Sequence, residues 1–308
     1  MSEAAASENR SGYAAALGAY IIWGFLPLYL LLVRSVPPFE FVGWRIIFTL
    51  PICLAIMAAR RQAAALKQAL GQPRALGWLC VSALLIGFNW VVYVWAIQMN
   101  HVFAASLGYY INPLLNVLLG TVFLGERLTR LQWAAVALAA VGVGILASEA
   151  LAMLGISLCL AFSFAMYGLV RKQVPVGSLP GLTIESALLI LPAFGIAWFY
   201  AAMPQGPAFG QELGLSLAIV LGGVVTAVPL LLFALAARRL PYSTLGFIQF
   251  LAPSIVFLLG LFVFRESLRP VQLVCFLFIW SAAGLFVYDL IARKRKAALA
   301  EKRRLTVP

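Results

Sequence analysis

Residues 106–129 read SLGYYINPLLNVLLGTVFLGERLT, an apolar run interrupted by tyrosines, asparagines and a proline. A similar stretch, TLGFIQFLAPSIVFLLGLFVFRESLR, occupies residues 244–269. Sliding the first stretch by 140 positions pairs Pro113 with Pro253, Gly120 with Gly260, Glu126 with Glu266, Leu128 with Leu268, and Gln132 with Gln272. The chain therefore repeats an apolar segment that ends in a charged loop.

Composition sets the class of protein. The chain has 308 residues, of which 64% are hydrophobic and 10% are charged, outside the usual range of soluble domains. A helix needs roughly 20 apolar residues to cross the hydrocarbon layer. Ten such stretches occur, at residues 12–33, 39–59, 76–97, 103–124, 131–148, 151–170, 181–203, 214–236, 242–264 and 271–292. The sequence predicts an all-α integral membrane protein with ten transmembrane helices.

The basic residues predict the orientation. Cytoplasmic loops of membrane proteins are rich in Lys and Arg. With the N-terminus in the cytoplasm, all of the 22 basic residues lie on that side except Arg34, Arg45, Arg265 and Arg269. Residues 293–308 form a basic cytoplasmic tail. We therefore expect both termini in the cytoplasm, contact of basic residues with membrane lipid, and no nucleic-acid partner despite the net charge of +12.

The repeat divides the chain into two halves, residues 12–148 and 151–292, each with five of the predicted helices. Because five is an odd number of crossings, the second half must enter the membrane upside down. Inverted repeats around a central site are a recurrent construction of secondary transporters, since two similar halves can exchange roles in opening to either side. The sequence thus predicts two inverted five-helix repeats.

Several blocks carry a resemblance to a known family. They are IGFNWVVYVWA (86–96), SLGYYINPLLN (106–116), FLGERL (123–128), LCLAFSFAMYGLVRK (158–172), TAVPLLLF (226–233) and STLGFIQF (243–250). On these blocks the chain resembles the RarD-like branch of the drug/metabolite transporter (EamA) superfamily. The resemblance implies ten helices in two inverted EamA-type repeats, a central substrate cavity and the bacterial inner membrane. Ala104 and Trp44 stand where the family pattern has Glu and often His, so the resemblance does not identify the substrate.

Polar and aromatic side chains recur at helical spacing within the spans. A polar group deep in a membrane either packs against another helix or faces a wet cavity. Each residue is open to both interpretations, and for the set we favour a shared cavity for a small-molecule substrate. The expected lining is Trp23, Asn89, Trp90, Tyr93, Tyr109, Asn112, Asn116, Tyr167, Thr226 and Gln249. Pro113 and Pro253 are expected to kink their helices beside it.

Three charged residues within spans, Arg45, Glu185 and Asp289, are candidates for charge or proton coupling. Arg45 either pairs with Glu40 or attracts an anionic solute. Glu185 is the strongest proton-coupling candidate because burial favours the neutral carboxyl group. Its alternative role is that of an interfacial glutamate favoured by the helix dipole. The two residues enter from opposite sides of the membrane, so a direct bridge between them is not expected.

The loop carboxylates have a structural interpretation. Glu126 and Glu266 lie in loops beside arginines, where capping or bracing of the loops is expected.

These features favour a secondary transporter, a permease or exporter, that moves a small organic metabolite or drug-like solute across the bacterial inner membrane by alternating access. Proton coupling is one option. The alternative is an intramembrane enzyme acting on lipid or a lipid-linked precursor, which would need a cluster of catalytic carboxylates or histidines at one membrane face. The chain has one histidine and no recognisable catalytic or phosphate-binding motif. We therefore expect no enzymatic activity, no metal and no cofactor.

Overall fold

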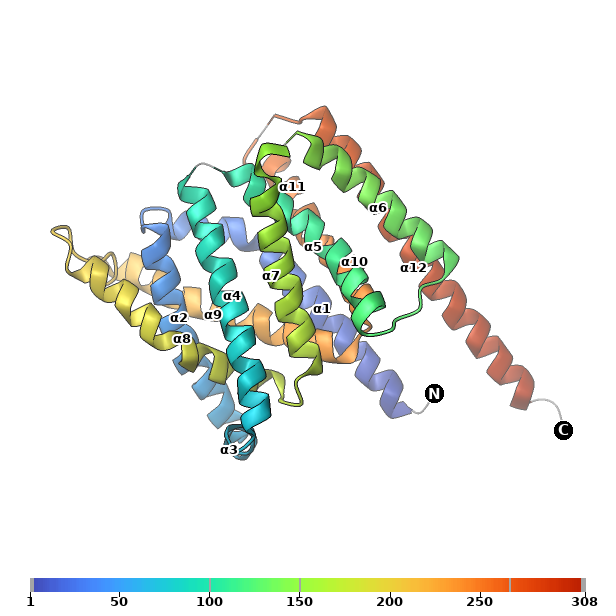
Figure 1. Cartoon of the computed structure of the whole chain (residues 1–308), viewed down its shortest axis with the longest axis horizontal. Coiled ribbons are helices and arrows are strands. Elements are labelled where there is room, and N and C mark those ends of the chain that lie inside the picture. The colour runs from blue at the N-terminus through green and yellow to red at the C-terminus, as the bar shows by residue number, and fades with distance from the viewer. Residues whose placement is uncertain (1–2, 100, 150, 266, 306–308) are drawn as a thin grey trace.

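The computed structural model describes residues 3–99, 101–149, 151–265 and 267–305, and these residues form a helical bundle without strands (Figure 1). The first half contains α1 (Glu3–Leu30), the 3-10 turn η1 (Leu31–Val33), α2 (Pro38–Ala59), α3 (Ala63–Leu70), α4 (Pro73–Gln98), α5 (Val102–Phe123) and α6 (Arg130–Ser148). The second half contains η2 (Leu151–Met153), α7 (Leu154–Gln173), α8 (Ser178–Ala201), α9 (Leu213–Arg239), α10 (Tyr242–Gln249), α11 (Leu251–Phe262) and α12 (Pro270–Leu305).

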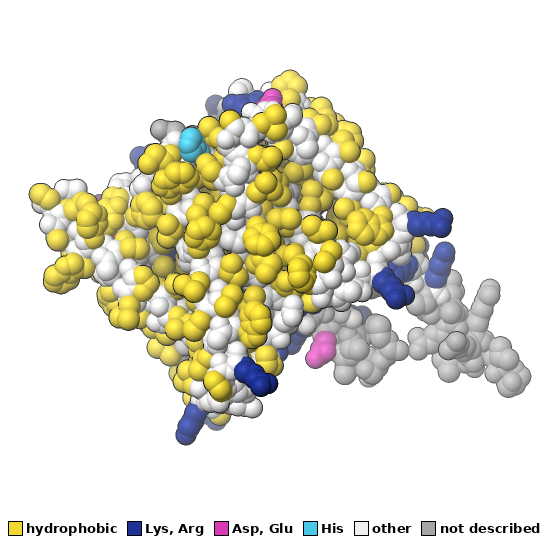
Figure 2. Space-filling view, viewed as in Figure 1, with side chains coloured by type: hydrophobic (Ala, Val, Ile, Leu, Met, Phe, Trp, Pro, Cys, Tyr) yellow, Lys and Arg dark blue, Asp and Glu magenta, His cyan; other side chains and the backbone are white. Residues whose placement is uncertain are grey.

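Within the described residues, ten helical segments are long and apolar enough to cross a membrane, which confirms the predicted number. The face shown in Figure 2 is largely hydrophobic across its middle, and Lys and Arg side chains lie toward its ends. Large apolar side chains are exposed on the outside of the bundle, among them Leu191 and Trp198, each 78% exposed. Such exposure is compatible with lipid and not with water, so the chain is a multi-pass membrane protein.

The predicted ninth span, residues 242–264, is divided into α10 and α11, with Phe250 between them. Proline has no backbone N–H to donate, so Pro253 cannot bond to the carbonyl four residues earlier, that of Gln249. The division falls where this bond is missing. In contrast, α5 continues without interruption through Pro113.

One helix was not predicted from the sequence. The eight residues of α3 are too few to cross a membrane and lie between the second and third spans. Only Ala69 of this helix is buried, in a cluster with Leu79, Val170 and Ile184. The remaining residues of α3 are partly or fully exposed, which is typical of a short helix at the edge of the bundle.

Corresponding helices of the two predicted halves make corresponding contacts. Helix α1 packs against α9 and α11, and its counterpart α7 packs against α4 and α5. Three further pairs, α2 with α8, α5 with α10, and α6 with α12, each join a helix to its own counterpart. This pattern is consistent with two related halves of inverted topology.

Both chain ends lie on one side of the bundle (Figure 1), here called the terminal side, and the opposite side is called the far side. On the terminal side the Glu126 carboxylate accepts hydrogen bonds from the backbone N–H of Tyr242, and from the backbone N–H (2.9 Å) and hydroxyl (2.6 Å) of Ser243. These groups begin α10, so Glu126 caps that helix, as expected of a loop carboxylate. Its repeat partner, Glu266, lies outside the described residues.

Helices α5 and α10 pack closely at Gly246. A Cβ atom on Gly246 would lie 2.6 Å from the backbone oxygen of Pro113 and 3.1 Å from the Cβ of Asn116. Small residues allow membrane helices to pack backbone against backbone. Gly246 therefore sets the distance between the two helices that carry the repeated segment.

We predict that Gly246→Ala destabilises the protein by about 1–3 kcal/mol, because the added methyl group overpacks this crossing. The measurement is thermal unfolding of the purified protein in detergent, and the expected result is a lower midpoint. The matched control is Gly144→Ala on α6, where nothing lies within 4 Å of the added atom. An equal or higher midpoint for Gly246→Ala than for the control would show that the crossing is not close.

Candidate functional site

Three of the predicted amides form one hydrogen-bonded group, here called the amide network: Asn112 and Asn116 on α5, and Gln249 at the end of α10. Asn116 donates to the Gln249 side-chain oxygen (2.7 Å), and the Gln249 side-chain nitrogen donates to the Asn112 oxygen (2.5 Å). Asn112 donates in turn to the Ala161 carbonyl of α7 (2.6 Å). All three amides are at least 95% buried, and their hydrogen bonds join three helices, although the Asn116 side-chain oxygen has no hydrogen-bond partner.

Asn89 makes a similar connection between α4 and α7. Its side-chain nitrogen donates to the Leu160 carbonyl (2.8 Å) and to the Ser163 hydroxyl (2.9 Å). Hydrogen bonds between membrane helices contribute about 0.6 kcal/mol each on average. In this conformation the predicted amides therefore act mainly as contacts between helices.

A second group, here called the Arg45 site, lies toward the far side and consists of Arg45, Trp90, Tyr93 and Tyr109. Arg45 is seven residues into α2, about 10 Å along its axis. Its guanidinium carbon lies 4.3 Å from the Trp90 ring centroid, a cation–π contact. The rings of Tyr93 and Tyr109 meet edge to face at 5.9 Å, and both phenols are close enough to interact electrostatically with Arg45.

A third group, here called the Glu185 pair, lies toward the terminal side. Glu185 on α8 and Arg171 on α7 are 3.5 Å apart, and their side chains are 1% and 0% exposed. The hydroxyls of Ser82 and Tyr167 donate to the same carboxylate, and Arg171 donates to the Ser178 carbonyl (3.1 Å). The carboxylate is buried and partnered, so Glu185 is not a solvent-exposed residue at a helix start.

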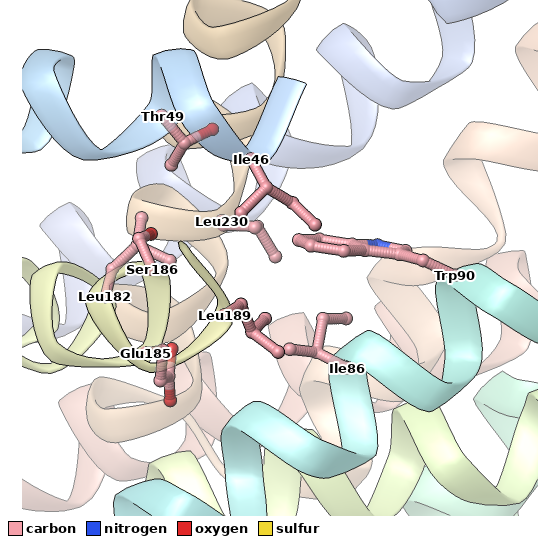
Figure 3. Close-up of a pocket in the computed structure, with 9 residues that line it drawn as sticks. All are labelled: Ile46, Thr49, Ile86, Trp90, Leu182, Glu185, Ser186, Leu189 and Leu230. Atoms are coloured by element: carbon pink, nitrogen blue, oxygen red, sulfur yellow. The ribbon is translucent and has the colours of Figure 1, made fainter. Parts of the chain in front are cut away.

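Apolar side chains separate the Arg45 site from the Glu185 pair. A cavity of about 10 Å³ lies between α2, α4, α8 and α9, enough for about one water molecule. In Figure 3, Ile86, Leu189 and Leu230 lie between the Trp90 ring and the Glu185 carboxylate, and all of them line this cavity. The layer of apolar residues closes the path between the two charged groups in this conformation.

A second cavity of similar size lies beside the Arg45 site. It is bounded by α4, α5 and α7, and its lining includes Asn89, Tyr109 and Asn112. Predicted lining residues of the first and second groups therefore do border one small space. Neither cavity is large enough for an organic solute in this conformation.

The remaining predicted residues lie apart from these groups. Trp23 packs in an aromatic cluster with Tyr20 and Phe233. Thr226 donates to the Gly222 carbonyl within its own helix (2.7 Å). Asp289 lies near the terminal end of the α12 span and is 3.9 Å from Arg293.

Glu40, and the residues Trp44 and Ala104 that differ from the family pattern, make hydrogen bonds that do not involve Arg45. Glu40 accepts from the Trp44 indole (3.0 Å) and the Ala208 backbone N–H (2.7 Å), so it is engaged away from Arg45. Of the two options expected for Arg45, the pair with Glu40 does not appear among the ion pairs of the described residues. Ala104 is fully buried, and its carbonyl accepts from Ser157 on α7 (2.7 Å).

Sequence reasoning missed four partners of the predicted residues: Arg171 and Ser82 at Glu185, Ser163 at Asn89, and Tyr20 at Gln249. Arg171 was interpreted as one of the cytoplasmic cations. The signal that could have identified it is Glu185 itself, since a buried carboxylate in a membrane needs a cation. Arg171 is a basic residue at the same end of the bundle.

The described residues contain no group of three His, Cys, Asp or Glu side chains that could hold a metal.

Comparisons with known proteins give a consistent result. The EamA-like transporter family matches residues 10–148. Protein RarD of Escherichia coli K12 is 42% identical over 95% of this chain and 99% of its own length. An uncharacterized transporter of Bacillus subtilis is 38% identical over 94% of this chain and 97% of its own. A crystal structure with 18% identity covers 90% of this chain and 97% of its own, with a TM-score of 0.72, which supports the fold alone.

We predict that Arg171→Gln and Glu185→Gln each lower the free energy of unfolding by about 3–5 kcal/mol, because each leaves an unpaired buried charge. The double variant loses less than the sum, since it leaves neither charge. A double-mutant cycle of denaturant unfolding in detergent measures this coupling. Arg293→Gln, which breaks a pair whose basic member is 56% exposed, is the control and costs under about 1 kcal/mol. Additive effects of the two single changes would contradict the pairing.

Proposed function

The chain belongs to the RarD-like branch of the EamA-like transporter family, and from this we propose that it is a secondary transporter for a small organic solute. The related proteins support a membrane transporter in general terms. The proposal adds alternating access, the bacterial inner membrane and a bilayer orientation with both termini in the cytoplasm. That orientation rests on the distribution of basic residues.

The observation that carries the proposal is the contrast between two equivalent positions. Arg45 and Glu185 are 140 positions apart, the offset of the sequence repeat, and each is seven residues into its helix. They enter from opposite sides of the bundle. Arg45 is partly exposed, whereas Glu185 is 1% exposed. Alternating access requires that the side formed by one half is open while the side formed by the related half is closed.

Proton coupling is proposed at Glu185. Its carboxylate is held by Arg171, Ser82 and Tyr167, which come from two other helices, α4 and α7. A proton on the carboxylate would remove the attraction to Arg171 and weaken this junction. Protonation could thereby change the relative stability of the closed terminal side.

The intramembrane-enzyme alternative gains no support from the described contacts. Glu185 and Asp289 lie on different helices, α8 and α12, and each has a basic partner of its own. They do not form a shared acid–base site.

We predict saturable uptake or release of a solute from a metabolite panel in liposomes that contain only this protein, with a rate that changes when a pH gradient is applied. Glu185→Gln removes the dependence on the gradient, and Asp289→Asn keeps it. If Glu185→Gln is not recovered folded, the Arg171→Gln/Glu185→Gln variant carries the same test. Full gradient dependence without Glu185 would refute the proton assignment, and absence of flux across a broad panel would refute the transporter proposal.

A separate prediction concerns access from the two sides. In a variant lacking Cys53, Cys80, Cys159 and Cys275, we expect a membrane-impermeant maleimide applied outside cells to label Tyr109→Cys but not Tyr167→Cys. Tyr109 is 47% exposed and Tyr167 is fully buried. Arg34→Cys, at an exposed position on the far side, is the positive control. Equal labelling of positions 109 and 167 would contradict a closed terminal side.

A further inference from the structure

Arg45 is a cation inside the bundle without an anionic partner. Its side-chain Nε is buried and forms no hydrogen bond, and no carboxylate among the described residues pairs with it. The groups that interact with it electrostatically are the phenols of Tyr109, Tyr93 and Tyr29. By contrast, Arg171, the other arginine deep in the bundle, has Glu185. A charge within a membrane span is costly to leave unpaired.

The Arg45 site lies toward the far side, where Arg45 is partly exposed and Tyr109 has exposed surface. Tyr109, Asn112 and Asn116 share one face of α5, since they are separated by three and seven residues. That face is buried at Asn112 and Asn116, where α5 packs against α10, but Tyr109 is 47% exposed. Its phenol nevertheless interacts with Arg45 of α2 and Tyr93 of α4, so it points into the bundle. The hydroxyl end of Tyr109 therefore lies inside the bundle beside Arg45.

We propose that the Arg45 site binds the carboxylate of a singly charged organic anion that enters from the far side. This inference rests on the proposed transport function and specifies its substrate class. The guanidinium has the planar donor geometry that matches a carboxylate with two parallel hydrogen bonds. One bound carboxylate neutralises one arginine, so the occupied site has no net charge.

The surroundings of Arg45 also specify the body of the solute. Trp90, Tyr93 and Tyr109 present aromatic rings, and Phe164 and Leu160 line the adjoining cavity. That cavity has room for about one water molecule in this conformation, so it must widen when a solute binds. Aromatic walls favour a planar apolar group by contact area and ring stacking. Phenol hydroxyls at the same place offer hydrogen bonds to the remaining carboxylate lone pairs. The preferred ligand is thus a carboxylate on a planar apolar body.

A phosphate monoester fits this site less well. It carries close to two negative charges at neutral pH, and the described residues provide one cation at the site. The excess charge would remain unneutralised among aromatic rings. A neutral or cationic analogue of the same shape would leave Arg45 unpaired or repel it.

The test uses the purified full-length protein in detergent at physiological ionic strength, with benzoate as the probe. Ligand-dependent thermal stabilisation gives the dissociation constant and tolerates weak binding. We expect stabilisation by benzoate, a weaker effect of phenyl phosphate, and none from benzamide or benzylamine. Arg45→Gln weakens benzoate binding by about tenfold or more. Arg45→Lys retains the preference for benzoate over benzamide at reduced affinity, because it retains the charge but not the planar donor pair.

Arg34→Gln, which removes an exposed arginine on the far side, is the matched control and leaves benzoate binding unchanged. Size-exclusion profiles and the unfolding midpoint without ligand establish that each variant is folded. Equal stabilisation by benzoate and benzamide, or an unchanged dissociation constant in Arg45→Gln, would overturn the proposal. A stronger effect of phenyl phosphate would overturn the choice of a carboxylate. Binding is measured in detergent and flux in liposomes. A negative binding result therefore overturns the proposed substrate class without overturning the proposed transport function.

Discussion

A polar group inside a lipid-embedded bundle must find its partner within the protein, because hydrocarbon offers none. This constraint accounts for most of the interior contacts of the structure. Asn112, Asn116 and Gln249 bond to one another across α5 and α10, and Arg171 pairs with Glu185. Among the charged side chains deep in the described bundle, Arg45 differs in having no oppositely charged partner, since its interior contacts are with aromatic rings and phenols. The unpaired charge of Arg45 is therefore the most informative feature of the interior.

The equivalent positions of the two halves carry side chains of opposite charge in different surroundings. Arg45 and Glu185 occupy equivalent places, yet Glu185 is buried against Arg171, whereas Arg45 is partly exposed and has no oppositely charged partner among the described residues. Ile86, Leu189 and Leu230 lie between Trp90 and Glu185 and leave room for about one water molecule. Interior packing is too dense to deform gradually. A change of access would accordingly require this apolar layer to repack between discrete arrangements.

The sequence was sufficient to predict the ten spans, because the length and hydrophobicity of a membrane helix follow directly from the thickness of the bilayer. It was also sufficient to predict the interior stripe of Tyr109, Asn112 and Asn116, which depends on helical spacing alone. Gln249 was expected in the same lining, but its hydrogen bonds to Asn112 and Asn116 could not be predicted, since they depend on how α5 and α10 cross. The sixth predicted span ended at residue 170, one residue before Arg171. The helix instead continues to Gln173 and carries Arg171 to Glu185.

The Glu185 pair indicates what closure around Arg45 would require. A buried charge is tolerated on the terminal side because Arg171 and Glu185 neutralise each other with their side chains 0% and 1% exposed. The chain provides no such carboxylate for Arg45 among its described residues, so sealing the far side over the empty site would strand a cation. A bound carboxylate would supply the missing charge and make the closed arrangement electrostatically similar to the one at Glu185. The solute would then favour closure through its own charge, which is the differential affinity that a ligand needs in order to shift a conformational equilibrium.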